Sequence, residues 1–243
     1  MRIKINFRSR GKVVLPIQYN HIIQACLLKW LNEENYQKFI HNTGYKYENR
    51  QFKMYSFSKV MGNFKFNRED KTLIFDKKFS LVVTSEEDKF LSYIANNIIL
   101  SDSINIKGQE IMIESVNILK CNIEEDMEIY TLSPITVYST FQHNEKKKTY
   151  YYSPFESEFS ELIRENLIKK YKAFYGTLPK NSEFSIEGIN RVKQSVLNYK
   201  GITIKGWNGE FKIKGSKELI NLAFNSGIGS KNSQGFGCIE RRE

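Results

Sequence analysis

Near its end the chain reads Gly227-Ile228-Gly229-Ser230-Lys231-Asn232-Ser233-Gln234-Gly235-Phe236-Gly237, in which two Gly-apolar-Gly triplets flank five polar residues. Four glycines in eleven positions indicate a loop with an unusual backbone, because glycine adopts positive φ without steric cost. Successive exposed N–H groups in such a loop form a nest that binds anions, and Lys231 adds a mobile positive charge. The loop therefore predicts a phosphate-bearing partner, contacted through Gly227, Gly229, Lys231, Gly235 and Gly237.

A purely structural role is the alternative for this loop. The preceding residues, Lys217 to Asn225, follow a helical pattern, and Phe236 to Ile239 read as a short strand. A helix C-cap followed by a bulge would also place glycines here. The spacing does not fit a dinucleotide fingerprint, because no strand precedes it, or a Walker loop, because no Gly-Lys-Ser/Thr ends it.

Working back from the loop, the second half of the chain reads as strand, helix, two strands, helix and strand. Ser153-Pro154-Phe155-Glu156 has the form of a capping box with proline at the first helical position. Asn208-Gly209 is a strong hairpin signal between two apolar–polar alternations. The expected elements are a strand at Thr131 to Tyr138, a helix ending at Gly176, a hairpin of Ile202 to Trp207 with Glu210 to Lys214, the helix Lys217 to Asn225 and the final strand.

The first half repeats this order. Asn20 is the expected N-cap of a helix that continues through Trp30. A second helix is expected from Glu86 to Leu100. Strands are expected at Arg2 to Arg8, Phe52 to Ser58, Thr72 to Asp76, Phe79 to Thr84, Ile104 to Lys107 and Glu110 to Leu119.

This doubled order predicts an α+β fold of two tandem ferredoxin-like (RRM-like) βαββαβ domains. The first domain is expected to cover residues 1–122 and to carry the candidate catalytic residues. The second is expected to cover residues 123–243 and to carry the glycine loop, with a linker near Cys121 to Met127. A single mixed α+β domain is the alternative.

Composition narrows the class of partner. The formal net charge of +10 favours a polyanion such as nucleic acid. Three scattered cysteines and three histidines argue against a disulfide scaffold and a His-rich metal site, so we expect no metal and no cofactor. The absence of a long apolar run and of a signal-peptide pattern predicts a cytoplasmic protein without a membrane partner.

A basic strand face is a second candidate for binding phosphates. In the predicted hairpin, apolar residues alternate with lysines, so one face is apolar and the other basic. A solvated lysine face is the ordinary explanation of such a strand. The lysines on or beside this face are Lys200, Lys205, Lys212 and Lys214.

Cleavage of RNA without a metal needs a base for the attacking 2′-hydroxyl, an acid for the leaving 5′-oxygen and positive charge for the phosphorane. Histidine suits the proton transfers. His41 is the best placed of the three histidines, at a predicted polar helix end, and Lys53 opens the following strand twelve residues later. Interaction of His41 with the helix dipole alone is the alternative.

The chain resembles the CRISPR-associated repeat-RNA endoribonucleases, the Cas-six family of the RAMP superfamily, over essentially its whole length. The terminal Gly-apolar-Gly-x5-Gly-apolar-Gly motif is that family's signature. Three further matches occur in order: Pro16-Ile17-Gln18-Tyr19-Asn20-His21, Lys53-Met54-Tyr55-Ser56-Phe57-Ser58 and Leu132-Ser133-Pro134-Ile135-Thr136-Val137.

The resemblance implies a metal-independent enzyme that cuts precursor CRISPR RNA once per repeat and leaves 2′,3′-cyclic phosphate and 5′-hydroxyl ends. It implies catalytic roles for His41 and Lys53. The family's third catalytic residue, a tyrosine of the first helix, corresponds to Trp30, so Tyr36 or Tyr45 could substitute, or His41 could act as base and acid in turn. The glycine loop is then expected to position RNA and to pack the second domain.

Two other functions stay open at this stage. The Trp30 substitution motivates a non-catalytic repeat-RNA-binding subunit of a CRISPR interference complex. An unrelated basic double RRM-like protein would show no preference for the repeat. The sequence also leaves open whether the chain joins a larger effector complex or forms a homodimer.

Overall fold

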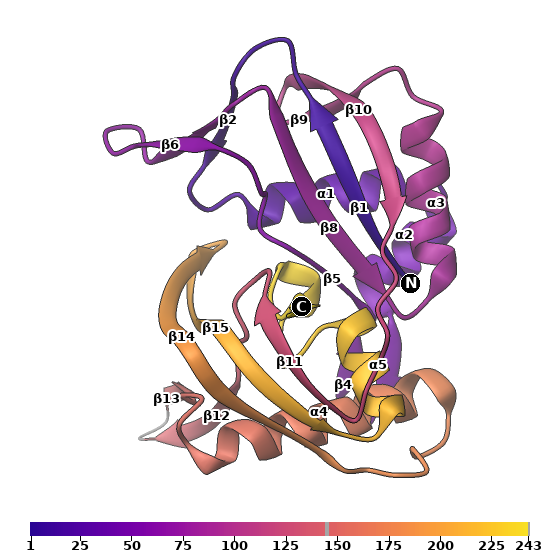
Figure 1. Ribbon diagram of the computed structural model, residues 1–243, viewed down its shortest axis with the longest axis vertical. Coiled ribbons are helices and arrows are strands. Elements are labelled where there is room, and N and C mark those ends of the chain that lie inside the picture. The colour runs from indigo at the N-terminus through magenta and orange to yellow at the C-terminus, as the bar shows by residue number, and fades with distance from the viewer. Residues whose placement is uncertain (144–145, 243) are drawn as a thin grey trace.

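Strand β1 (Arg2–Arg8) is the central strand of the first of two similar sheets. Its apolar residues Ile3, Ile5 and Phe7 alternate along the strand and are buried in the core of the first domain. The computed structural model describes residues 1–143 and 146–242 (Figure 1). β1 pairs antiparallel with β8 (Lys78–Ser85) on one side and with β10 (Gln109–Ile118) on the other.

The first sheet has the order β5-β8-β1-β10-β9. Its edge strands are β5 (Tyr55–Phe57) and β9 (Ile104–Ile106). Helices α1 (Asn20–Trp30) and α3 (Asp88–Ile99) contribute their apolar sides to the same core as β1 and β8. Without β9, the order β10-β1-β8-β5 is the arrangement of a ferredoxin-like βαββαβ unit.

The second sheet has the order β14-β15-β11-β16 and repeats this topology. Its strands are β11 (Asp126–Thr131), β14 (Phe184–Tyr199), β15 (Ile202–Gly215) and β16 (Ile239–Arg241), and its helices are α4 (Ser157–Tyr175) and α5 (Lys217–Ser226). The predicted tandem ferredoxin-like fold is therefore confirmed. The predicted boundary at residue 122 lies in the connection between β10 and β11.

Smaller elements extend the two sheets. A three-stranded sheet consists of β2 (Val13–Pro16), β7 (Thr72–Phe75) and β6 (Phe64–Asn67), and two hairpins consist of β3 (Tyr45–Tyr47) with β4 (Arg50–Phe52) and of β12 (Tyr138–His143) with β13 (Lys146–Tyr151). Short helical turns are α2 (Glu34–Lys38), the π turn η1 (Phe39–Thr43) and the 3₁₀ turn η2 (Asn232–Gln234).

The predicted hairpin about Asn208-Gly209 was wrong. Both residues lie inside β15, which pairs along most of its length with β14, a strand that the sequence pattern did not predict. The turn lies at Lys200-Gly201, where both residues have positive φ, as a two-residue hairpin turn requires. Long-range pairing with β14 thus overrides the local turn signal.

Four other boundaries differ from the sequence prediction. β11 ends at Thr131, where the predicted strand began, because the residues after it instead bond to Cys238, to Trp207 of β15 and to the glycine loop. The final strand starts at Ile239 rather than Phe236. Helix α4 begins at Ser157, after the Glu156 carboxylate accepts the Ser153 N–H. The left-handed backbone of Met54 (φ 56°) divides the predicted strand Phe52 to Ser58.

The two domains share buried contacts. The guanidinium of Arg2 on β1 donates to the Ile239 carbonyl at 2.8 Å and to Glu240 at 2.9 Å, and lies 5.1 Å from the ring centroid of Phe224 on α5. Phe52 and Met54, although early in the chain, belong to the core of the second domain. These contacts fix how the domains lie against each other in Figure 1.

The glycine loop, residues Gly227–Gly237, lies at this junction and is buried rather than exposed. Ile228 and Phe236, the apolar centres of its two triplets, are fully buried. Asn20 donates its side-chain amide to the carbonyls of Gln234 and Gly235, so it binds the loop and is not the N-cap of α1. Ser56 of β5 donates to the Phe236 carbonyl at 2.9 Å.

Five backbone donors of the loop have partners inside the protein. The N–H groups of Ile228, Ser230 and Gly237 donate to the carbonyls of Gly237, Thr136 and Pro134. Those of Gln234 and Gly235 close the η2 turn. A purely structural role of the glycine loop thus accounts for much of its sequence pattern, because these N–H groups hold the loop together instead of facing an anion.

A buried lysine on the neighbouring helix α4 binds the glycine loop. Lys170 of α4 is 3% exposed, and its ammonium donates to the Gly227 carbonyl at 2.6 Å and to Asn232 Oδ1 at 2.8 Å. The Asn232 amide in turn donates to the carbonyls of Ile228 and Phe236, one in each triplet. Burial lowers the pKa of Lys170 to about 7, against the opposing effect of the Glu86 charge.

Gly237→Ala should destabilise the protein far more than Gly201→Ala. Both residues have positive φ, which costs alanine about 1–2 kcal/mol. At Gly237 a Cβ would lie 1.9 Å from the Ile228 carbonyl oxygen, whereas nothing lies within 4 Å at Gly201. Overpacking should add about 1–3 kcal/mol at Gly237 only. Denaturant unfolding measures both variants, and equal losses would contradict the buried position of the loop.

Lys170→Met should remove a pH dependence of stability. Between pH 7 and the usual lysine value of 10.5, the unfolded chain keeps a proton that folded Lys170 has released. The free energy of unfolding of the wild type should therefore rise with pH in this range, relative to the variant, by up to about 1.4 kcal/mol per pH unit. Paired urea titrations from pH 6 to 9 measure this difference, which should be flat below pH 7.

Candidate active site

His41 lies on a π turn between the two domains. The N–H of Gly44 donates to the Phe39 carbonyl at 2.7 Å, which closes η1 in the i→i+5 pattern. The His41 side chain is exposed, and its Nδ1 lies 2.7 Å from Asn42 Oδ1. An amide oxygen only accepts, so Nδ1 donates in this contact and Nε2 keeps its lone pair in the neutral ring. Single π turns are frequent at functional sites.

Lys53 lies between β4 and β5, next to this turn. Its Nζ is buried and has no hydrogen-bond partner among the described residues, and burial lowers its pKa. At Gly44, which ends the turn, a Cβ would lie 2.9 Å from Lys53 Cδ and 2.4 Å from the Phe52 carbonyl oxygen. The turn that carries His41 therefore ends against the stem of Lys53, with no room for a side chain between them.

The residues considered for the third catalytic role have different surroundings. Trp30 is buried, with its ring centroid 6.3 Å from that of Phe7. The Tyr36 hydroxyl donates to the Glu87 carboxylate. The pKa values of both Tyr36 and Tyr45 are raised, first by burial and then by a hydrogen bond to Glu87 and its charge. These tyrosines keep their protons at neutral pH and are unsuited to act as bases.

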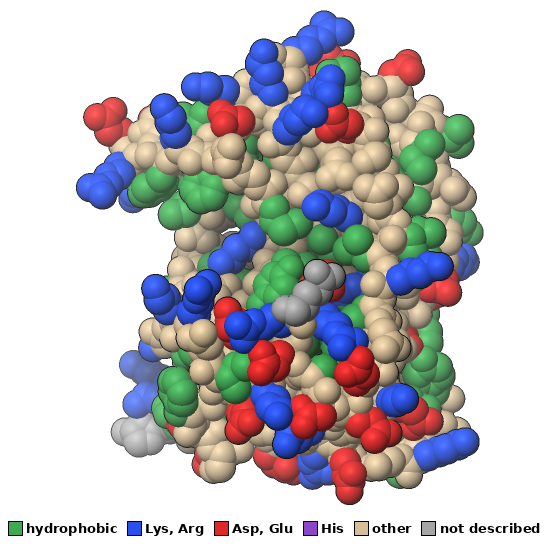
Figure 2. Space-filling view, in the orientation of Figure 1, with side chains coloured by type: hydrophobic (Ala, Val, Ile, Leu, Met, Phe, Trp, Pro, Cys, Tyr) green, Lys and Arg blue, Asp and Glu red, His purple; other side chains and the backbone are tan. Residues whose placement is uncertain are grey.

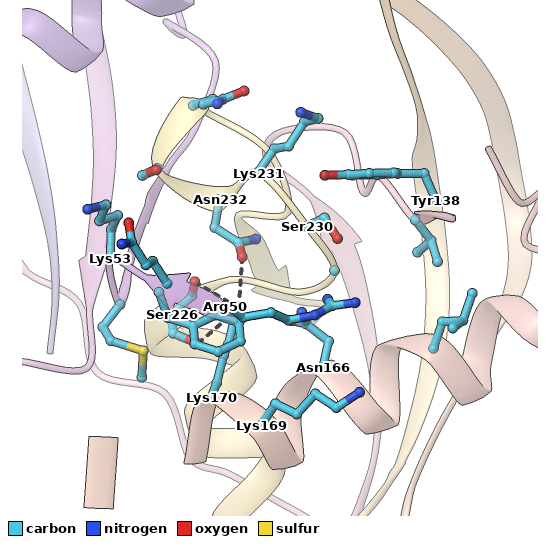
Figure 3. Close-up of a pocket in the computed structure, with 18 of the residues that line it drawn as sticks. Arg50, Lys53, Tyr138, Asn166, Lys169, Lys170, Ser226, Ser230, Lys231 and Asn232 are labelled. Atoms are coloured by element: carbon cyan, nitrogen blue, oxygen red, sulfur yellow. Dashed lines mark hydrogen bonds between the residues drawn. The ribbon is translucent and has the colours of Figure 1, made fainter. Parts of the chain in front are cut away.

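A cationic cleft of about 670 Å³ lies between the domains. The β4–β5 segment forms one wall, and α4, the glycine loop and the start of β12 form the other. The basic side chains in its lining are Arg50, Lys53, Lys169, Lys170 and Lys231. Figure 3 labels all five, and Lys170 is the buried one among them. Glu165 is the single carboxylate among the described lining residues, and Lys169 pairs with it at 3.4 Å.

Gly229 and Lys231 are the two predicted phosphate-binding residues of the glycine loop that line the cleft, and Lys231 carries the charge. Its backbone is left-handed (φ 60°), and its Nζ lies 5.1 Å from the ring centroid of Tyr138. Both side chains line the cleft. Gly227, Gly235 and Gly237 are buried and do not line the cleft, and RNA binding by the four glycines stays a prediction.

The four predicted strand lysines lie outside the residues that line this cleft. Lys200 is in the β14–β15 turn, 5.9 Å from the ring centroid of Tyr199, and Lys205 is exposed on β15. Lys212 and Lys214 lie near the other end of β15, and each pairs with Asp126, at 3.3 and 3.4 Å. Acidic and basic side chains are interleaved over this domain in Figure 2. Binding of RNA by these four lysines stays a prediction.

Sequence reasoning missed Arg50, Lys169, Lys170 and Glu87. One signal was present for Lys170, because it continues the buried stripe of Phe159, Ile163 and Leu167 at helical spacing. A lysine on an apolar stripe must find buried acceptors or lose its charge. Nothing local marked the others, since their positions follow from how the two domains meet.

The described residues show neither a metal-binding cluster nor a membrane-spanning helix. The described residues contain no group of three or more His, Cys, Asp or Glu side chains that could hold a metal ion. Within the same residues, no helix combines the length and the apolar character needed to cross a membrane.

Comparison with curated proteins finds relatives that match nearly the full length of the chain. CRISPR-associated endoribonuclease Cas6 1 of Methanocaldococcus jannaschii is 26% identical over 246 residues, covering 98% of this chain and 92% of that protein. CRISPR-associated endoribonuclease Cas6 2 of the same organism is 25% identical, covering 98% of each.

Solved structures and a family model agree with these relatives. A structure described as a Cas6-related gene product from Pyrococcus furiosus has a TM-score of 0.87 at 23% identity, covering 100% of this chain and 98% of that one. One described as a RAMP protein binding different RNA substrates has a TM-score of 0.84 at 22% identity, with both chains fully covered. The model of the C-terminal part of CRISPR-associated protein Cas6 matches residues 114–241, more than half of the chain. The chain therefore belongs to the CRISPR-associated Cas6 family.

Proposed function

We propose that this chain is an endoribonuclease that cuts precursor CRISPR RNA within each repeat, without a metal ion, by attack of a 2′-hydroxyl on the adjacent phosphate. The observation that carries the proposal is the contact between the His41 turn and the stem of Lys53, whose buried Nζ has no hydrogen-bond partner among the described residues. The names of the curated relatives, CRISPR-associated endoribonucleases, support the same reaction.

We propose a role for each of these two groups. Nε2 of His41 takes the proton of the 2′-hydroxyl as its oxygen bonds to phosphorus. Lys53 supplies positive charge to the phosphorane, and its partial burial strengthens that interaction. The bond from phosphorus to the 5′-oxygen then breaks, and protonated His41 returns the proton to that oxygen. The products are a 2′,3′-cyclic phosphate and a 5′-hydroxyl.

A tyrosine hydroxyl is the alternative to protonated His41 as the acid of the second proton transfer. Tyr36 and Tyr45 flank the His41 turn and hold their protons tightly because of burial and Glu87. An acid must release its proton in the transition state, so a raised pKa makes both tyrosines poor donors. This favours His41 acting as base and acid in turn over a third catalytic tyrosine.

The cleft supplies the binding surface next to this chemistry. Arg50, Lys169 and Lys231 place positive charge along a cavity that also contains Lys53, as a phosphate backbone requires. One structurally similar protein is described as binding different RNA substrates. Assembly with other CRISPR effector subunits and pairing of two copies of the chain stay predictions.

His41→Ala should slow cleavage of the repeat RNA by about 10²- to 10⁴-fold, because one group performs both proton transfers. Single-turnover cleavage in EDTA is the measurement, with the 3′ end of the upstream product tested for a 2′,3′-cyclic phosphate. His21→Ala, which changes a half-buried histidine of α1, should cut at nearly the wild-type rate. Equal rates for wild type and His41→Ala would remove His41 from the mechanism. A wild type that binds the repeat but does not cut it would favour the non-catalytic binding subunit.

Arg50→Ala and Lys231→Ala should each weaken repeat binding and reduce the salt dependence of affinity by about one counterion. Lys212→Ala and Lys214→Ala are matched controls, because Asp126 already pairs with both lysines. Fluorescence anisotropy at several KCl concentrations measures the slopes. If the two controls lose as much affinity as the cleft variants, the RNA follows the basic face of β15 that the sequence pattern predicts.

A further inference from the structure

Two adjacent carboxylates follow β8, and each binds a different tyrosine. The Glu86 side chain accepts the hydroxyl of Tyr175, which is on α4 of the second domain. The Glu87 side chain accepts the hydroxyl of Tyr36, which is on α2, just before the turn that carries His41. Glu87 is half-buried and is not among the residues that line the cationic cleft.

Glu87 contacts the chain on both sides of His41. Tyr36 lies five residues before His41 and donates directly to the carboxylate. Tyr45 lies four residues after it, and its pKa is raised first by burial and then by the same carboxylate. The Phe39 ring joins the two tyrosines, with centroids 6.3 Å from Tyr36 and 5.4 Å from Tyr45.

The segment that contains Glu87, residues 85–87 at the end of β8, also holds Met54, the residue that follows Lys53. The Ser85 hydroxyl donates to the Met54 carbonyl at 3.1 Å, and the Glu86 N–H donates to that carbonyl at 3.0 Å. These two bonds fix a left-handed residue that is not glycine, with φ 56°. Such a conformation persists only where its surroundings hold it. The Glu87 N–H completes the arrangement by donating to the Ser85 hydroxyl at 3.1 Å.

We infer that Glu87 is a positioning residue for RNA cleavage: it holds the π turn of His41 in a fixed place relative to Lys53. This inference rests on the proposed function, because it assigns Glu87 a role only through these two groups. No described contact of Glu87 reaches the cleft, so it is not a catalytic residue. Its contribution is to the alignment of two groups that come from separate segments of the chain.

The expected effect follows from the sensitivity of the reaction to alignment. Displacing a reacting group by about 1 Å can cost about 100-fold in rate. Without the carboxylate, Tyr36 loses its acceptor, and the π turn keeps its ring contacts, its Gly44–Phe39 hydrogen bond and its packing against Lys53. We therefore expect Glu87→Ala to slow the chemical step by about 10- to 100-fold, with RNA affinity within about twofold of wild type.

The test is a double-variant cycle with the full chain and its repeat RNA. The single-turnover rate at saturating protein and the dissociation constant are measured for the wild type, Glu87→Ala, His41→Ala and the combined variant. If Glu87 acts through His41, the combined variant should be no slower than His41→Ala alone, since groups that act as a unit are not additive. Glu87→Gln, which keeps an acceptor for the tyrosines, should recover much of the rate.

Glu86→Ala is the matched control. It removes the neighbouring carboxylate, which also accepts a tyrosine hydroxyl, but its side chain contacts α4 instead of the His41 segment. Its cleavage rate should stay near that of wild type, even where its unfolding midpoint falls. If Glu87→Ala does not fold, Tyr36→Phe removes only the hydroxyl donor and enters the same cycle in its place.

Three results would overturn the inference. Glu87→Ala could cut as fast as wild type, lower the rate equally in the His41→Ala background, or weaken RNA binding without slowing the chemical step. Failure of the proposed function has a different signature. In that case His41→Ala itself cuts at the wild-type rate, or the wild type does not cut the repeat.

Discussion

A single buried amino group, that of Lys170, forms the hydrogen bonds on which the rest of this structure depends. It binds the last carbonyls of α5 and the Asn232 side chain, and Asn232 then joins the two triplets of the glycine loop. A charge in this position is costly unless acceptors surround it, and the loop supplies these acceptors only in its folded form. The loop, α4 and α5 are therefore ordered together, and with them one wall of the cationic cleft.

The other wall depends on contacts between domains. The segment from Tyr45 to Met54 belongs to the first half of the chain, but Phe52 and Met54 pack in the core of the second domain. Lys53 lies between these two anchors, so its position relative to α4 is set by packing on both sides. The candidate site is thus a product of the junction, with His41 and Lys53 from one half and most of the binding surface from the other.

Much of the fold was predictable because ferredoxin-like topology follows from hydrophobic periodicity and element order. β1 and the helices α1, α3 and α5 lie close to their predicted ranges. The clearest failure has a physical cause: strand pairing overrode a local turn signal at Asn208-Gly209, which β14 holds inside a strand. His41 and Lys53 were found through the resemblance to a known family, whereas Arg50 and Glu87 gain their roles only from tertiary contacts that leave no local pattern.

The packing of the glycine loop also bears on whether the halves of this protein are separable. At Gly235 a Cβ would lie 2.6 Å from the Phe57 ring and 2.7 Å from the Asn20 amide, both in the first half of the chain. The most recognisable motif of the second half therefore has the first half as part of its core. The connection near residue 122 separates the two ferredoxin-like topologies, but contacts such as those of Gly235 join the two halves of the chain. The glycine loop of the second ferredoxin-like unit therefore takes part of its packing and two of its hydrogen-bonding side chains, Asn20 and Ser56, from the first unit.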